Sequence, residues 1–300
     1  MKKLTRDQIV YSLDKQHPPA ITVDPGETLL LETHDARTGS IRSAADLLDR
    51  PHPRGANPAT GPIAVRGAEL GDTLIVEILD IALADQGYLA VKAQTGLLAQ
   101  RADRFVTRMI PIRNGHFVFS ETLCIPVRPM IGVIGAAPAG EGIPTGDAGA
   151  HGGNMDNRYV TTGATVYLPV QAPGALLGIG DVHAAMGDGE ITMVGLEIAA
   201  EVTVRVGLQK GAPCLRPWLE TPTEWVTTGD DIDPAQACRI AAEEMAALLQ
   251  RQLGVTFDEA YMLMSACGDV QICQMCGPGE FFTTARAVFP KIPAHPPDSH

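Results

Sequence analysis

Apolar and polar residues alternate along much of this chain, which is the pattern of β-strands with one buried face. The alternation is clearest over 191–208, where every second residue from Leu196 to Leu208 is apolar and the other parity carries Glu197 and Glu201. Side chains two apart point to the same face of a strand. The segment predicts one long strand, or two, with the apolar parity buried and Glu197 on the solvent face.

Shorter β segments precede it, separated by turn signals such as Pro25-Gly26, Gly71-Asp72 and Asn114-Gly115. Strands are predicted within 21–35, 64–82, 105–118, 123–134, 165–170 and 175–183. The stretch 49–62 holds four prolines and two glycines, which predicts a loop.

The pattern changes after Pro222. Asp233-Pro234 is a helix start signal before 235–253, and Gly254 is placed to end that helix. A second helix is predicted at 257–266 and two strands at 269–276 and 281–288. The expected fold is mainly β: a sandwich-like or barrel-like body over 1–215, which carries the site, and a smaller α+β C-terminal portion over 216–300 with two helices.

Composition supports a β-rich protein and narrows its function. The 300 residues include 31 glycines and 23 prolines, as many short strands joined by turns require. A net charge of -12 argues against non-specific nucleic-acid binding. There is no apolar run of about 18 residues, so no membrane span is expected. The polar sequence after Lys2 and Lys3 is no secretory signal.

The six cysteines indicate free thiols and a reducing cytoplasm, because three of them crowd into ten residues near the C-terminus. Cys273 and Cys276 form a CxxC pair, but no second pair or thioredoxin-like βαβ pattern accompanies it. We therefore interpret them as ordinary buried thiols.

The segment Gly178–Glu190 (GIGDVHAAMGDGE) is the strongest chemical candidate. In a strand, Asp181 and His183 project from one face at chelating distance, and mixed carboxylate and imidazole ligation suits zinc, manganese or iron. The alternative is a buried Asp–His hydrogen bond with no metal. The turn Gly187–Gly189 can return Glu190 to the same end of the sheet.

A second candidate cluster lies about 25 residues upstream, at the end of a glycine-rich stretch over 132–153. It offers His151, Asn154 and Asp156, either as site residues or as ordinary turn residues. The stretch has no Walker lysine and no serine, and no G-x-S-x-G elbow occurs. Serine nucleophiles and phosphate loops are thus disfavoured, and the two clusters are expected to meet over a metal ion.

Several segments together resemble the acetamidase/formamidase family in order and spacing, over roughly residues 20 to 290. They are Asn57–Pro62 (NPATGP), Gly67–Asp72 (GAELGD), Pro129–Pro138 (PMIGVIGAAP), His151–Asp156 (HGGNMD) and Gly180–Glu190 (GDVHAAMGDGE). The resemblance implies a protein with a β-rich fold that generally forms homodimers or higher homo-oligomers. It also implies that the protein hydrolyses short amides to a carboxylate and ammonia with a divalent metal, usually zinc. Some similar members act on γ-lactams.

Residue by residue, the resemblance implies four metal ligands, two candidate acid–base groups and a substrate or oxyanion contact. The ligands are Asp35, His151, Asp181 and His183; the acid–base candidates are Glu141 and Glu190; the contacts are Asn154 and Asp156. Glu141 is slightly favoured as the base because a glycine-flanked loop can aim it freely.

We therefore expect metal-dependent hydrolysis of small neutral amides, since no arginine or lysine for a charged substrate tail is evident near these motifs. A γ-lactamase, or a hydrolase of another larger amide, is the alternative enzyme. A metal-stabilised binding protein without turnover is the alternative outside the enzymes.

Overall fold

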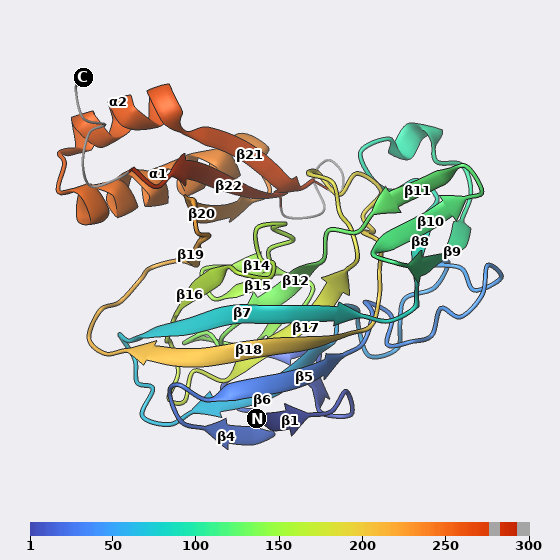
Figure 1. Cartoon of the computed structure of the whole chain (residues 1–300), viewed down its shortest axis with the longest axis horizontal. Coiled ribbons are helices and arrows are strands. Elements are labelled where there is room, and N and C mark those ends of the chain that lie inside the picture. Colours follow the sequence, from blue (N-terminus) through green and yellow to red (C-terminus); the bar gives the residue numbers. More distant parts are fainter. Residues whose placement is uncertain (276–282, 293–300) are drawn as a thin grey trace.

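The computed structural model describes residues 1–275 and 283–292, and most of its elements are strands (Figure 1). Within these ranges the largest sheet has nine strands, in the spatial order β1 (Lys2–Leu4), β5 (Thr28–Thr33), β18 (Ala200–Gln209), β7 (Thr73–Leu83), β16 (Thr165–Pro169), β19 (Trp218–Glu220), β20 (Glu224–Asp231), β22 (Thr283–Pro290) and β21 (Asp269–Gln274). A seven-stranded sheet runs through β14 (Ala148–Gly149), β15 (Gly152–Asn154), β12 (Met130–Gly135), β17 (Leu177–His183), β6 (Ala59–Val65) and β2 (Ile9–Val10), and β4 (Ile21–Val23) also pairs with β6.

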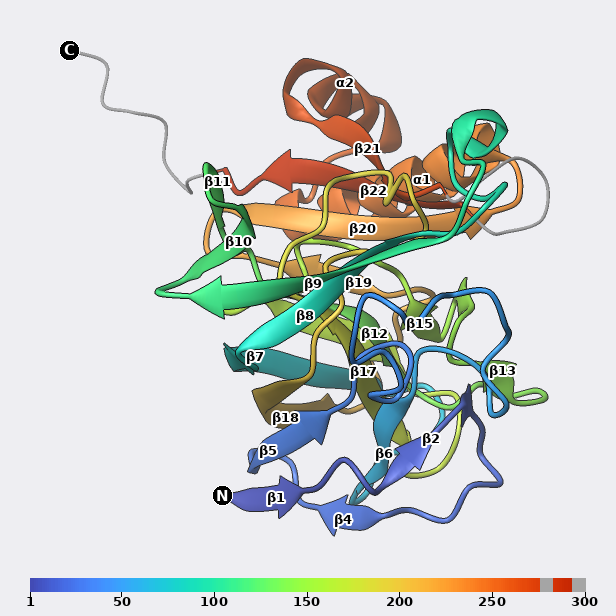
Figure 2. The same ribbon diagram turned by 90° about the vertical axis from the view of Figure 1, so that its right-hand side faces the viewer.

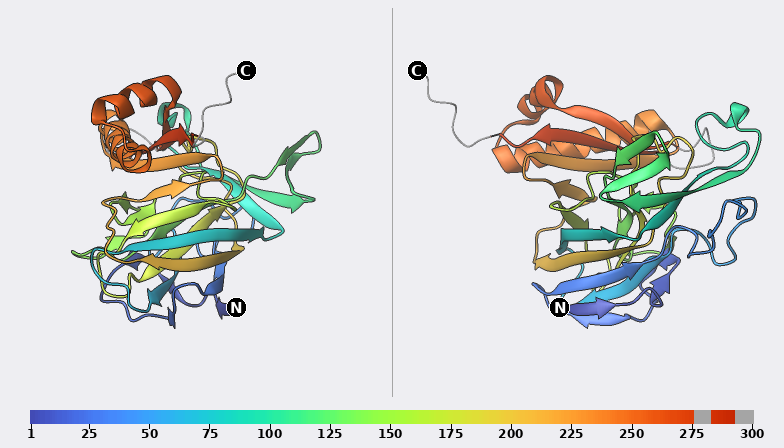
Figure 3. Two further views of the ribbon diagram at one scale, coloured as in Figure 1. Left: turned by 60° about the vertical axis from the view of Figure 1, so that its left-hand side comes forward. Right: turned by 45° about the vertical axis from the view of Figure 1, so that its right-hand side comes forward.

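A four-stranded sheet projects from the side of this body, as Figures 2 and 3 show. Its order is β11 (Leu123–Pro126), β10 (His116–Ser120), β9 (Val106–Arg113) and β8 (Gln86–Val91). Two short strands, β13 (Ile143–Pro144) and β3 (Ser12–Leu13), pair with each other. Among the described residues, the remaining non-α element is a 3-10 turn, η1 (Ala99–Arg101).

One large apolar core joins the nine-stranded and seven-stranded sheets. On β18 the residues Val202, Val204 and Val206 are fully buried and their neighbours are more exposed, which is the alternation that the sequence predicts. They share the core with Ile63 and Ile179 from the other sheet. The central strands β6, β12 and β17 are buried along their whole length. The predicted mainly β class is confirmed.

The two predicted helices lie near the C-terminus and cover β20 and β22 (Figure 1). They are α1 (Pro234–Leu253) and α2 (Phe257–Cys267). The Asp233 side chain caps α1 by accepting the N–H of Ala235, and Gly254 ends it with a left-handed φ of 69°. β19 pairs with β16, so the nine-stranded sheet continues across the predicted boundary at residue 215. Neither helix has both the length and the apolar character that crossing a bilayer requires, as far as the described residues go.

Two sequence predictions were wrong. The loop predicted over 49–62 ends early, because β6 begins at Ala59 and is held in the sheet by pairing with β17 and β2. The strand predicted over 191–208 begins only at Ala200. Before it, the chain crosses β17 through an isolated bridge between His183 and Glu197, and this places Glu197 in the interior, 3% exposed.

The cap of α1 gives a stability prediction. Replacing Asp233 with Ala removes the side-chain acceptor for the first turn and is expected to lower the free energy of unfolding by about 1 kcal/mol. Urea denaturation followed by circular dichroism measures this. Glu243→Ala, at an exposed position of α1, is the control and should be nearly neutral. An unchanged denaturation midpoint in Asp233→Ala would show that the cap contributes nothing.

Candidate metal centre

β17 carries Asp181 and His183 at its end, on the same face. The His183 Nε2 lies 3.7 Å from Asp181 Oδ1, and both side chains are almost completely buried. Their i, i+2 spacing on a strand therefore brings the two groups together as the sequence predicts.

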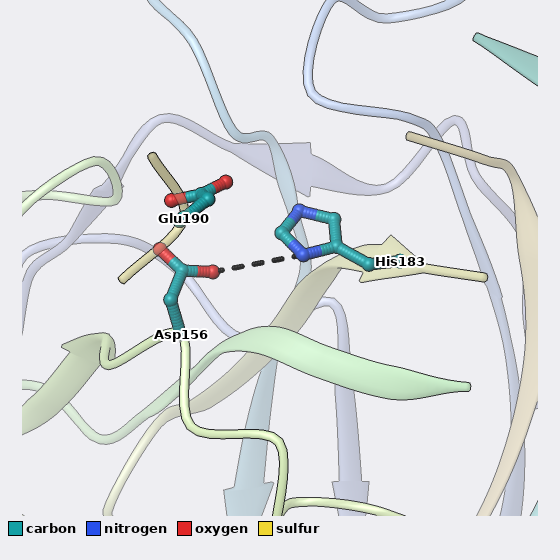
Figure 4. Close-up of side chains that lie close together, drawn as sticks. All are labelled: Asp156, His183 and Glu190. Carbon is teal, nitrogen blue, oxygen red and sulfur yellow. Dashed lines mark ion pairs between the residues drawn. The ribbon is translucent and has the colours of Figure 1, made fainter. Parts of the chain in front are cut away.

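Asp156 and Glu190 reach the same histidine from two other segments (Figure 4). Asp156 follows β15, and its Oδ1 lies 3.9 Å from His183 Nδ1. Glu190 follows the turn after Gly187, and one ligand atom from each of Asp156, His183 and Glu190 falls within 4.8 Å of the others. The two predicted clusters thus meet in the structure.

Glu197 is the nearest group to the other side of the imidazole, and the alternation in the sequence missed it. Its Oε1 lies 3.1 Å from His183 Nε2. A second potential ligand group therefore comprises Asp181, His183 and Glu197. Glu197 comes close to His183 through a β-bridge between these two residues. This bridge forms when the chain folds back over β17, so the sequence pattern does not reveal it.

Gln274 on β21 was also missed, although it links the acidic residues. Its Nε2 donates to Asp156 Oδ2 at 2.6 Å and to Glu190 Oε2 at 2.8 Å. A side chain from the C-terminal portion therefore completes a site that sequence analysis placed wholly within residues 1–215.

Several buried atoms of this cluster have no hydrogen-bond partner among the described residues. They are both ring nitrogens of His183, Asp156 Oδ1, Asp181 Oδ1 and Glu197 Oε2. An unpaired buried polar atom costs about 1–3 kcal/mol, and more when it is charged. Four carboxylates around one imidazole therefore require protons or a cation to compensate them.

The pKa shifts of these side chains reflect the same crowding of buried charged groups. Burial raises the pKa of Asp156 and of Glu190, and burial raises that of Glu197 to about 8. Burial lowers the pKa of His183, but the neighbouring Glu197 and Asp181 outweigh this and raise it well above its ordinary value. A cation bound within the cluster would favour the ionised carboxyl groups and the neutral histidine, and so would oppose these shifts. Nitrogen and oxygen donors in this set fit a divalent cation such as zinc, manganese or iron.

The backbone at the site is strained in a way that aims the carboxylates. Asp156, Asp181 and Glu190 have φ values of 43°, 54° and 41°, in the left-handed region that non-glycine residues rarely adopt. Gly132 lies opposite on β12, where a Cβ would come within 2.6 Å of Asp156 Oδ1 and 2.9 Å of Asp181 Oδ2. Over the imidazole, a Cβ on Gly195 would come within 2.5 Å of His183 Nδ1. The two glycines leave the space that the cluster occupies.

The remaining predicted site residues lie apart from the two ligand groups. Asp35 is buried, and its Oδ1 accepts the backbone N–H groups of Arg37 and Gly39. Burial, and then the charge of Arg216, lower the pKa of His151 to about 4, and His151 belongs to neither ligand group. Glu141 is exposed on the outward turn after Gly140 and does not line the cavity described below.

A cavity of about 520 Å³ opens over the cluster. Asp156, Asp181, Glu190 and Glu197 contribute to its lining, together with Asn154, Tyr88 and Gln274. Its outer lining includes Arg37, Arg50 and Lys92. The expectation of a site without arginine or lysine is therefore wrong, because the loop before β6 and the end of β8 bring these side chains in from positions far from the motifs.

The cysteine interpretation agrees with the structure as far as it reaches. Cys273 is 1% exposed, and burial raises the pKa of its thiol to about 12, so the thiol stays protonated and unreactive. Cys276 lies outside the described residues.

The β-sandwich body and its buried carboxylate–histidine centre define a class that comparison with known proteins identifies. The sequence model that describes the acetamidase/formamidase family matches this chain over residues 3–145 and 139–277. The chain therefore belongs to this family and is an amide-hydrolysing enzyme.

Three similar proteins show the range of the likeness. The crystal structure of an acetamidase from Bacillus halodurans is 38% identical, with a TM-score of 0.92 over 96% of this chain and 97% of that one. A formamidase from Methylophilus methylotrophus is 29% identical over 74% of this chain and 73% of its own length. A gamma lactamase from Delftia acidovorans, 23% identical with a TM-score of 0.65 over 94% of this chain and 88% of that one, shares the fold.

The glycine opposite the cluster can be tested directly. Gly132→Ala is expected to lower the free energy of unfolding by about 1–3 kcal/mol, because its Cβ overlaps the oxygens of Asp156 and Asp181. The same overlap should reduce the metal that the purified protein retains. Gly140→Ala, in the same glycine-rich stretch but with open space around its Cβ, is the matched control. Wild-type stability and metal content in Gly132→Ala would contradict the assigned geometry.

Proposed function

We propose that this protein hydrolyses the C–N bond of small amides to a carboxylate and ammonia, and that it does so with a bound divalent metal, most simply zinc. The observation that carries the proposal is the buried set Asp181, His183 and Glu197, in which both ring nitrogens of His183, Asp181 Oδ1 and Glu197 Oε2 lack hydrogen-bond partners among the described residues. Both carboxylates of this set line the cavity, where a substrate can reach them.

We assign the metal to this set because of its spacing. Ligand atoms about 2.0–2.1 Å from a tetrahedral zinc ion lie roughly 3.3 Å apart, and His183 Nε2 lies 3.1 Å from Glu197 and 3.7 Å from Asp181. Asp156 Oδ1 lies 3.9 Å from the other ring nitrogen and would have to approach it to take the orienting role that carboxylates have beside metal-bound histidines. If these residues held a divalent cation, it would lower the pKa of a water molecule beside it towards neutrality and would polarise a carbonyl group.

Glu190 is the proton carrier in this proposal. It lines the cavity, and burial raises its pKa, which suits a group that must take a proton from water and give it to the leaving nitrogen. Gln274 holds its carboxylate beside Asp156. The exposed Glu141 has no such position.

Asn154 provides the donor for the developing oxyanion. The Asn154 amide oxygen accepts a hydrogen bond from Asn57 Nδ2 at 3.1 Å, and this contact orients the side chain. The N–H groups of the Asn154 amide are then the donors that this side chain offers in the cavity. We do not assign this role to Asp156, because its Oδ2 already accepts a hydrogen bond from Gln274 and its Oδ1 faces His183.

Two further properties are proposed on separate grounds. Free thiols at Cys124, Cys214, Cys238, Cys267 and Cys273 support a reducing compartment, the cytoplasm. The family resemblance supports a homo-oligomer, which light scattering of the purified protein would measure.

His183 tests metal dependence. His183→Ala is expected to lose nearly all bound metal and amide hydrolysis, because it removes the group common to both potential ligand sets. Elemental analysis and ammonia release from formamide and acetamide measure the two effects, and opening of a γ-lactam tests the alternative activity. His116→Ala, on the exposed face of β10, is the control. Full metal content and activity in His183→Ala would refute the site, and metal binding without turnover of any amide would favour a binding protein.

The base is tested by a matched pair of substitutions. Glu190→Gln should reduce kcat by about 10²- to 10⁴-fold while metal remains bound, because it removes proton transfer at the reacting atoms. Glu141→Gln should retain wild-type rates, since Glu141 is exposed and outside the cavity. The opposite pattern would return the role to Glu141.

A further inference from the structure

The cavity is larger than the simplest amides require. Formamide and acetamide have three and four non-hydrogen atoms, whereas pockets of about 300–1,000 Å³ accommodate much larger ligands. At about 520 Å³ the cavity lies within that range. Most of its volume would therefore face the acyl part of a substrate whose amide group lies at the cluster.

Besides the acidic cluster, the lining includes three basic residues, Arg37, Arg50 and Lys92, and two further acids, Asp49 and Asp147. Arg37 is half-buried, its Nη2 donates to the backbone oxygen of Arg50, and its Nε is buried without a partner among the described residues. Lys92 also lines the cavity, and no ion pair among the described residues includes it. Arg50 is largely exposed and lies 4.0 Å from Asp49, which offsets its charge.

Arg37 lines the same cavity as Tyr88 and the acidic cluster, so a substrate held at the cluster can extend towards it. Burial raises the pKa of the Tyr88 phenol, and the carboxylates of Glu197 and Asp181 raise it further. The guanidinium of Arg37 acts on the same phenol in the opposite direction. Tyr88 is buried in the wall of the cavity that the acidic cluster and Arg37 share.

We propose that the preferred substrates are amides whose acyl chain ends in a carboxylate, with the amide at the acidic cluster and the carboxylate paired with Arg37. This rests on the proposed amide hydrolysis and specifies its substrate class. Arg37 lines the cavity and forms no ion pair among the described residues, and Arg is the residue that binds carboxylates with fixed geometry. Asp49 and Asp147 also line the cavity, so an amide with a cationic chain is the competing substrate class.

Three amides of similar size separate the classes: butyramide, succinamate and β-alaninamide, which end in a methyl, a carboxylate and an ammonium group. The wild-type enzyme should show a kcat/KM for succinamate about tenfold to a hundredfold above that for butyramide, as expected for a hydrogen bond to a charged group. Arg37→Gln should remove this preference and Arg37→Lys should restore part of it. Arg50→Gln, whose charge Asp49 already offsets, is the matched control and should keep the preference.

A binding measurement gives a readout besides turnover. Succinate should raise the melting temperature of the metal-loaded wild-type protein more than butyrate does, and Arg37→Gln should abolish the difference. Hydrolysis of butyramide with no gain for succinamate, or a preference for β-alaninamide, overturns this inference and leaves the proposed function intact. Hydrolysis of none of the three by metal-loaded protein overturns both.

Discussion

The mutual repulsion of buried carboxylates around His183 is the constraint on which the rest of this structure depends. Two unit charges about 4 Å apart interact by roughly 4 kcal/mol at the effective dielectric of a protein. Four acids crowd one imidazole here, two of them within 3.7 Å of a single ring nitrogen. Such a cluster is stable only where the surrounding fold holds it and a cation or protons compensate it.

The fold holds the cluster by local strain and close packing. The left-handed backbone at Asp156, Asp181 and Glu190 turns each carboxylate inward, and Gly132 and Gly195 leave room for their atoms and for the imidazole. Strain of this kind persists only where the surrounding structure determines it, and the fully buried strands on either side supply that structure.

The C-terminal portion also takes part in the site. Arg286 on β22 is fully buried, and its Nη2 donates to Asp188 Oδ2 at 2.6 Å, two residues before Glu190. Gln274 on the neighbouring β21 binds Glu190 itself. The last strands of the nine-stranded sheet therefore fix the turn that carries the proposed proton donor. A change in that portion would reach the chemistry through these two contacts.

The sequence by itself determined the elements whose signals are local. Alternation predicted the β class, Asp233 and Gly254 marked the ends of α1, and the i, i+2 spacing predicted that Asp181 and His183 share a face. The family motifs, which are contiguous, identified the chemistry.

Only the tertiary structure decided which distant residues meet those motifs. Glu197 reads as a solvent-facing residue until the chain folds over β17, and Gln274 and Arg37 come from segments with no motif of their own. Conversely, Glu141 looked well placed because glycines flank it, yet its loop turns outward. Periodicity reports the face of one element, whereas burial of a charge depends on what packs against that face, and that is a property of the whole fold.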